Sequence, residues 1–184
     1  IRSVGWIHEK FTRLPVPRYL KPAIGGLIVG GIGVFYPSVM GEGYEWIRQI
    51  MFPEKLTDSS LWLGEALMGE DQAIWSMAIA FLILLALLKV VATSITLGSG
   101  NPGGAFAPAI FIGVMGGAAF GLLLERMHFA HSSAAYAVMG MAGLIAGALG
   151  APITAIMITL RHGGNAPELM LPVMTTVALT AFVM

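Results

Sequence analysis

The sequence predicts an all-α fold, that of a polytopic membrane protein with broken and re-entrant half-helices. Hydrophobic residues make up 57% of the 184 residues and charged residues only 11%, whereas soluble domains carry roughly 25% charged residues. Residues 90–124 and 132–160 contain no Asp, Glu, Lys, Arg or His, which suits a bilayer. Glycine and proline repeatedly interrupt the apolar runs, so several helices are expected to be shorter than a full membrane span.

Composition also excludes some classes of protein. The net charge is zero, from ten basic and ten acidic residues, so the chain lacks the basic excess of nucleic-acid-binding proteins. Cysteine is absent, which removes disulfides and thiolate metal sites. The chain starts at Ile1 rather than at a methionine and stops at Met184 inside an apolar run. We therefore expect a fragment of a longer protein, incomplete at both ends.

The N-terminal segments predict an interfacial stretch followed by a membrane helix. Residues 2–21 mix basic, aromatic and proline residues, a composition typical of chain that lies along the lipid headgroups. An apolar helix follows over residues 22–36. We expect Gly26 and Gly30, four residues apart, to form a ridge on this helix against which a neighbouring helix packs closely.

Two short amphipathic pieces and one full span come next. Residues 44–52 and 61–68 are shorter than the roughly 20 residues that cross a hydrocarbon layer, so we expect half-helices or surface helices. Residues 72–97 form the longest apolar run and predict a full membrane span. Glu70 and Asp71 precede it, where acidic groups complement the positive end of the helix dipole.

Lys89 lies well inside this long span. An intramembrane cation is by default a candidate for function. The alternative, slightly favoured here, is that its side chain snorkels or pairs with a carbonyl or carboxylate of another helix.

The C-terminal half predicts a series of interrupted helices. A glycine-rich helix ends near Glu125, and its glycines recur every fourth residue as a packing surface at Gly113, Gly117 and Gly121. Further helices are expected at residues 133–149 and 153–160, separated by a Gly-Ala-Pro break, and a last one from about Pro167. His128 and His131 lie between the glycine-rich helix and the helix at residues 133–149. They favour a hydrated turn over a metal site.

Between the long span and the glycine-rich helix lies the stretch with the clearest chemical meaning, GSGNPGGAFAP at residues 98–108. An anion that crosses a membrane needs donors to replace its hydration shell, and the first free N–H groups of a helix supply them. Gly103 and Gly104 remove Cβ atoms where an ion would approach the backbone, and Pro108 fits the first turn of a helix. The simpler alternative is a tight connection that lets two helices pack, which is favoured for an isolated Gly/Pro loop.

Backbone amides suit such a site better than a lysine does. A conducting site must bind an ion well enough to admit it and weakly enough to release it, and a buried full charge tends to trap the ion. No cation occurs between Lys89 and Arg126. We therefore expect the N–H groups of this loop, not a side chain, to contact the anion.

At these residues the sequence resembles the CLC family of chloride channels and proton-coupled chloride exchangers. The family's GxFxP motif is matched by Gly104, Phe106 and Pro108, and the stretch before it by Thr96, Leu97, Gly98, Ser99 and Gly100. Ala151, Pro152, Ile153 and Thr154, followed by Leu171 and Pro172, look like the family's paired helices at the dimer interface. Gly25, Gly26, Pro37, Gly41, Gly43 and Tyr44 resemble the start of its second inverted repeat.

The resemblance implies that this chain is the second inverted-repeat half of a CLC membrane domain that transports chloride, as a channel or a proton-coupled exchanger. It implies anion binding by the backbone N–H groups of Gly104, Ala105, Phe106 and Ala107, supported by Gly98, Ser99, Gly100, Gly103 and Pro108. The family's gating and proton-transfer glutamates would lie in the other half. One departure is the run Arg161, His162, Gly163 and Gly164, where many members carry an acidic residue.

The resemblance further implies a multi-pass protein of the cell membrane that contacts lipid. It implies a homodimer through the helices at residues 153–160 and 169–184, no nucleic-acid partner, no metal, and no cofactor besides the transported chloride. Enzymatic activity is not expected, because no paired His/Glu zinc motif and no activated serine or aspartate pair is evident. The main alternative is a secondary transporter of a cation or an organic solute, which would also use broken helices.

Overall fold

Every regular element in the described stretches is a helix, which confirms the predicted all-α fold. The structure is a computed structural model that describes residues 9, 17, 20–40, 43–51, 72–129, 132–162 and 167–183. Its helices are α2 (Leu20–Phe35), η1 (Pro37–Val39), α3 (Tyr44–Met51), α5 (Gln72–Gly98), α6 (Phe106–Arg126), α7 (Ser133–Leu149), α8 (Pro152–His162), η3 (Pro167–Leu169) and α9 (Met170–Val183). These bounds lie within three residues of the predicted ones wherever the two can be compared. The predicted helix at residues 61–68, Glu70 and Asp71 lie outside the described residues, as does most of the predicted interfacial stretch.

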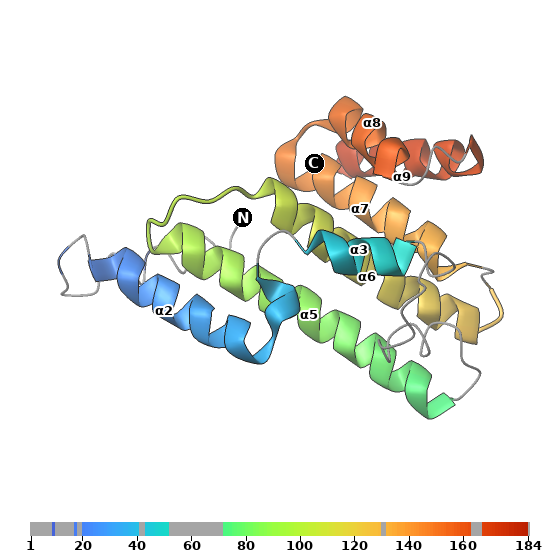
Figure 1. The fold of residues 1–184 in the computed structure, drawn as a ribbon. Helices are drawn as coiled ribbons and strands as arrows, with labels where there is room; N and C mark the ends of the chain where they lie inside the picture. Colours follow the sequence, from blue (N-terminus) through green and yellow to red (C-terminus); the bar gives the residue numbers. More distant parts are fainter. Residues whose placement is uncertain are drawn as a thin grey trace.

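α5 and α6 form the axis of the fold. Both are long and apolar enough to cross a bilayer, α5 over Trp75–Gly98 and α6 over Phe106–Arg126. In Figure 1, α6 runs back alongside α5, and α7 returns along the other side of α6. The 27 residues of α5 span roughly 40 Å at 1.5 Å per residue, which exceeds the roughly 30 Å of a hydrocarbon core.

The core is centred on α6 because helices cover it on several sides. α5 and α7 make its most extensive contacts, and the short α3 crosses it as well. Its fully buried large side chains are Ile110, Phe111, Val114, Met115 and Leu122. A helix covered in this way needs no polar face, which is why α6 lacks the apolar and polar alternation of a surface helix.

Glycines bring α6 and α7 into backbone contact, as the four-residue spacing predicted. A Cβ on Gly113 would lie 2.7 Å from the carbonyl oxygen of Gly140 and 2.8 Å from the Cα of Met141. One on Gly121 would lie 2.8 Å from the Cα of Ser133, and one on Gly117 would overlap the carbonyl oxygen of Tyr136. Without side chains at these positions the two helices approach closely enough for extensive van der Waals contact.

The corresponding prediction for α2 gains no support from the described residues. A Cβ on Gly26 or Gly30 would meet no atom within 4 Å, so these two glycines do not form a packing ridge in the described part of the chain. Gly25 and Gly33 face neighbours instead, Gly25 against Ser99 and Gly33 against Met40. These two glycines lie eight residues apart, which rotates them by about 80° around the helix, so each meets its neighbour in a different direction.

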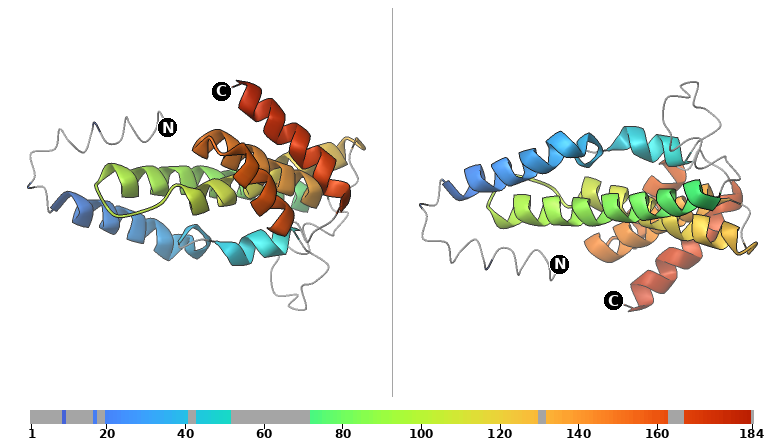
Figure 2. Two further views of the ribbon diagram at one scale, coloured as in Figure 1. Left: turned by 90° about the horizontal axis from the view of Figure 1, so that it is seen from above. Right: turned by 90° about the horizontal axis from the view of Figure 1, so that it is seen from below.

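The C-terminal helices pack on the outer side of α7. α7 ends at Gly150, which has φ +63° and donates its N–H to Ala146. Pro152 then opens α8, so the predicted break between these helices is confirmed. α8 and α9 both contact α7, and α9 runs obliquely to α5 (Figure 2).

The α6–α7 contact predicts opposite effects for two adjacent glycines. Gly117→Ala should lower the free energy of unfolding by about 1–3 kcal/mol, because the new methyl group overlaps the backbone of α7. Gly116→Ala is the matched control: nothing lies within 4 Å of its Cβ, and alanine favours a helix over glycine by about 1 kcal/mol. Reversible unfolding of the protein in mixed micelles measures both. Equal effects would contradict the described packing.

Candidate functional site

The loop at residues 99–105 returns along α5 and starts α6 beside the interior of that helix. Gly104 and Pro108 share a cavity wall with Thr93 and Lys89 of α5. Thr93 and Lys89 lie five and nine residues before the end of α5, which places them roughly 7–14 Å from that end. α6 therefore begins at a depth already covered by α5, as expected for a re-entrant helix (Figure 1).

A small polar cluster anchors this loop to α2. The Asn101 Nδ2 group donates to the carbonyl oxygen of Pro22 at 3.0 Å and to the Ser99 Oγ at 3.2 Å. The Ser99 hydroxyl in turn donates to the carbonyl oxygen of Thr96 at 3.1 Å. Gly25 must be glycine for α2 to approach, because a Cβ there would overlap the Ser99 side chain. Gly100, with φ +89°, turns the chain out of α5.

The head of α6 lacks the acceptors that a helix interior supplies to its N–H groups. Ala105 caps the helix and supplies no side-chain hydrogen bond, while its carbonyl oxygen accepts from Ala109 N–H at 3.0 Å. Within the described stretches, the N–H groups of residues 104–107 donate to no acceptor. Gly104 and Ala105 are exposed, and Phe106 and Ala107 are half-buried. Pro108, which has no N–H to satisfy, falls in the first turn.

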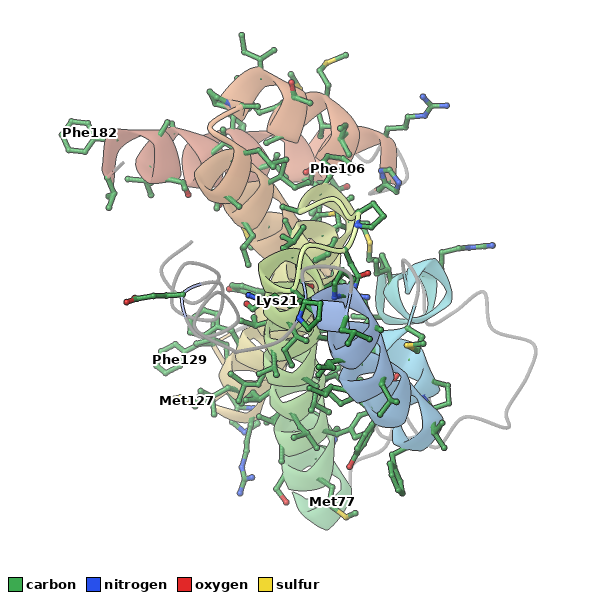
Figure 3. The ribbon with its side chains drawn as sticks, turned by 90° about the vertical axis from the view of Figure 1, so that its left-hand side faces the viewer. Lys21, Met77, Phe106, Met127, Phe129 and Phe182 are labelled. Atoms are coloured by element: carbon green, nitrogen blue, oxygen red, sulfur yellow. The ribbon has the colours of Figure 1, made fainter. Side chains whose placement is uncertain are left out.

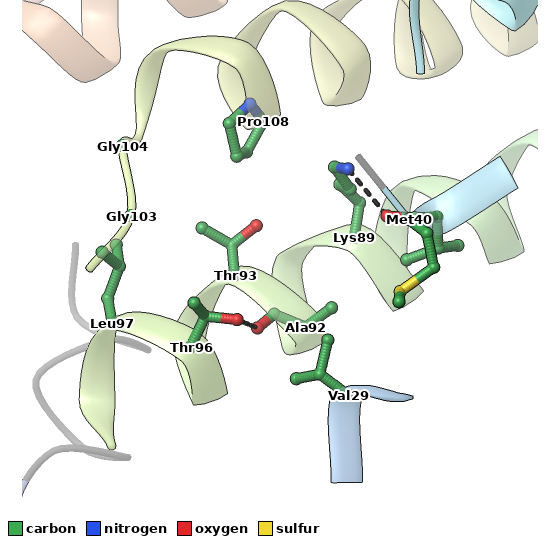
Figure 4. Close-up of a pocket in the computed structure, with 11 residues that line it drawn as sticks. Val29, Met40, Lys89, Ala92, Thr93, Thr96, Leu97, Gly103, Gly104 and Pro108 are labelled. Carbon is green, nitrogen blue, oxygen red and sulfur yellow. Dashed lines mark hydrogen bonds between the residues drawn. The ribbon is translucent and has the colours of Figure 1, made fainter. Parts of the chain in front are cut away.

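A cavity of about 150 Å³ lies behind this loop. Its walls come from α2, η1, α5, the loop and the first turn of α6. Its lining residues are Val29, Val39, Met40, Lys89, Ala92, Thr93, Thr96, Leu97, Gly103, Gly104 and Pro108 (Figure 4). Only some of the predicted anion-binding residues therefore line this cavity. Gly104 lines the cavity, whereas Ala105, Phe106 and Ala107 are not part of its wall.

Lys89 is buried between three elements. Only 4% of it is exposed, its Nζ donates to the carbonyl oxygen of Val39 at 2.7 Å, and it lies 5.2 Å from the centroid of the Phe111 ring. The favoured interpretation, pairing with a carbonyl of another segment, is confirmed. The position of Lys89 beside the loop is not visible in the sequence, because only the return of residues 99–105 along α5 brings them together.

A metal role for the histidines gains no support. Among the residues that the structure covers, no group of three or more His, Asp or Glu side chains could hold a metal ion. His128 lies in a turn with φ +58°, and His131 is outside the described residues.

A sequence model of the family described as voltage gated chloride channel matches residues 1–184. The chain belongs to this family, the CLC family. The resemblance stated from the GxFxP motif and its flanking stretches is thus confirmed, and with it the assignment as an integral membrane protein.

Named relatives match most of the chain. It is 30% identical to the chloride channel protein CLC-f of Arabidopsis thaliana over 99% of its length and 22% of that protein. It is 35% identical to the putative chloride channel protein ClcB-like of Ralstonia nicotianae, over 80% of the chain and 30% of the relative. It is 30% identical to the H⁺/Cl⁻ exchange transporter ClcA of Klebsiella pneumoniae, over 83% of the chain and 29% of the relative. The chain thus spans less than a third of these proteins.

The polar cluster at the loop predicts a loss of stability when Asn101 is truncated. Asn101→Ala should lower the free energy of unfolding of the protein by about 1–3 kcal/mol, because the Pro22 carbonyl and the Ser99 hydroxyl lose their donor. Thr175→Val is the control, since it removes one exposed hydrogen bond within α9 and should change stability by about 0.5 kcal/mol or less. Denaturant unfolding in micelles compares the two, and equal losses would mean that the cluster does not anchor the loop.

Proposed function

We propose that the protein transports chloride across a membrane, as a channel or as a proton-coupled exchanger, and that the head of α6 binds the anion. The observation that carries this proposal is the set of N–H groups at residues 104–107, which have no acceptor in the described part of the chain. Membership of the CLC family supports it. Relatives named as a chloride channel and as an H⁺/Cl⁻ exchange transporter both match, so the proposal covers both mechanisms.

The chemistry of the helix head fits a halide. The first N–H groups of a helix and its dipole together act as roughly half a positive charge. They can replace part of a hydration shell without binding the ion so tightly that it cannot leave. The loop glycines keep the approach open, because a Cβ on Gly104 would meet no atom within 4 Å.

The alternative, transport of a cation or an organic solute, has less support. A cation needs oxygen ligands, yet the first turn of α6 contains no acidic residue and presents N–H groups. The family membership also favours the anion hypothesis. We propose further that the protein acts by transport rather than by chemical conversion, and that it needs no cofactor besides the transported ion.

Anion flux tests the proposed function directly. Liposomes that contain the full-length parent protein and are loaded with chloride should release it when a counter-ion path is provided. Liposomes without protein are the control. Absence of chloride release by a protein that elutes as a folded species would overturn the proposal.

Two substitutions at the helix head should affect anion binding differently. Gly104→Val places a branched side chain over the exposed N–H groups and should weaken chloride binding by about tenfold or more, corresponding to about 1.4 kcal/mol. Phe106→Ala keeps every backbone N–H and removes a half-buried side chain that packs on the core. It should therefore reduce thermal stability more than chloride affinity.

Isothermal titration of the full-length parent with chloride, together with thermal unfolding, separates these effects. The two variants act as controls for each other, because one blocks the approach and the other weakens packing. Equal losses of affinity in both would contradict binding through the backbone.

We also propose a homodimer of the cell membrane that pairs through α8 and α9, at residues 153–160 and 169–184. These helices contact α7 on one side and expose large apolar side chains elsewhere, at Ile153, Met157, Leu171, Leu179 and Phe182. Figure 3 shows Phe182 projecting outward near the end of α9, where it is 90% exposed. A surface of this kind supports contact with lipid or with a second subunit.

Substitution of Ile153 tests the dimer. Ile153→Trp adds bulk to a side chain that is 78% exposed on α8 and should shift the full-length protein toward monomer. Leu27→Trp is the control, because Leu27 is 79% exposed on α2, away from the proposed interface. Light scattering after size-exclusion chromatography in detergent measures the mass. A dimer that both variants leave intact, or that both disrupt equally, would contradict an interface at α8.

A further inference from the structure

Lys89 lies beside the proposed anion site but has no role in it so far. It is a buried cation in the interior of α5 and lines the same cavity as Gly103, Gly104 and Pro108. In Figure 4 its side chain rises from α5 on the side that faces Pro108, and Thr93 projects from the same side of α5. The charge therefore stands behind the loop that carries the exposed N–H groups.

The contacts of Lys89 fix the position of its charge. Its Nζ donates to the carbonyl oxygen of Val39 at 2.7 Å, and the face of the Phe111 ring lies 5.2 Å away. A carbonyl oxygen and an aromatic face both favour an ammonium group. Because the group is tied to η1 and α6, it is not placed to move into the loop and coordinate an ion there.

A fixed charge at this position would act on the helix head through the electric field. The interaction between two charges about 10 Å apart, at an effective dielectric constant of about 20, corresponds to about a tenfold change in affinity. Salt screens a buried charge much less than an exposed one. The interaction energy of an ion with this field depends on the charge of the ion and not on its chemical identity. The affinity for all small monovalent anions should therefore rise by a similar factor.

We propose that Lys89 sets the anion affinity of the α6 head without touching the ion. This inference rests on the proposed function. The N–H groups of residues 104–107 contact the anion, and the Lys89 charge behind them raises the local potential. Such a division of roles avoids the tight trapping expected of a lysine in direct contact with the ion.

Three substitutions of Lys89 separate its charge from its hydrogen bond. Lys89→Gln keeps a donor for the Val39 carbonyl and removes the charge, Lys89→Arg keeps both, and Lys89→Met keeps neither. Arg126→Gln is the matched control, because it removes a charge from the last residue of α6, roughly 30 Å from the helix head. Isothermal titration of the full-length parent with chloride, bromide and nitrate measures affinity, and thermal unfolding measures stability.

The expected result is a loss of about tenfold in affinity for all three anions in the Gln and Met variants, with the order of preference among the anions unchanged. The Arg variant should bind within about threefold of the unaltered protein, and Arg126→Gln within about twofold. A purely structural role predicts the opposite: the Gln variant would bind normally, and the Met variant would lose stability and affinity together.

A second position tests the sign of the effect and keeps the inference testable if the Lys89 variants do not fold. Thr93→Lys adds a cation to the same cavity wall, one helical turn from Lys89, and should tighten binding of all three anions by several-fold. Normal anion affinity in Lys89→Gln overturns the role of Lys89 and leaves the proposed function intact. If Thr93→Lys is the variant that folds, normal anion affinity in Thr93→Lys has the same consequence. No anion binding by the unaltered protein overturns both.

Discussion

A helix that begins inside a membrane leaves N–H groups that lipid cannot satisfy, and this constraint governs the structure. Residues 99–105 carry the chain back along α5, so that α6 starts beside the interior of that helix. Each unsatisfied donor in hydrocarbon costs several kcal/mol. The head of α6 is therefore stable only where water, an anion or another polar group reaches it, which is the condition that an anion pathway meets.

The rest of the fold holds the start of α6 in place. α6 packs against α7 through glycines that allow backbone contact, and Asn101 and Ser99 tie the loop to α2 and to the end of α5. Gly43, with φ +70°, lets the chain before α3 pass the Phe111 ring, which a Cβ would overlap. Rigid neighbours on several sides keep the N–H groups aimed in one direction, and preorganised donors bind an ion without the cost of ordering them.

The charge of Lys89 and the dipole of α6 lie in separate parts of the proposed site. The part of α6 that would contact an anion offers only backbone donors, since its first turn carries neither a side-chain cap nor an acidic residue. The nearby full charge is that of Lys89, and its hydrogen bond to the Val39 carbonyl oxygen keeps it away from the loop. Direct contact of the anion with amides rather than with a lysine stays a prediction, and in our proposal the buried cation acts on the anion only through its longer-range field.

The sequence by itself determined the fold class, most helix bounds and the family. Apolar length and Gly/Pro interruptions set these properties locally: the span Gln72–Gly98, the break at Gly150 and the four-residue spacing from Gly113 are all visible in the sequence. Which face of α2 packs was not visible, and Gly26 was chosen where Gly25 makes the contact. The placement of Lys89 behind the loop was also decided only by tertiary structure, because helical periodicity describes one helix at a time. Contacts between residues distant in the sequence depend on how a loop returns the chain, and the conformation of residues 99–105 alone brings Lys89 and Gly104 to one cavity.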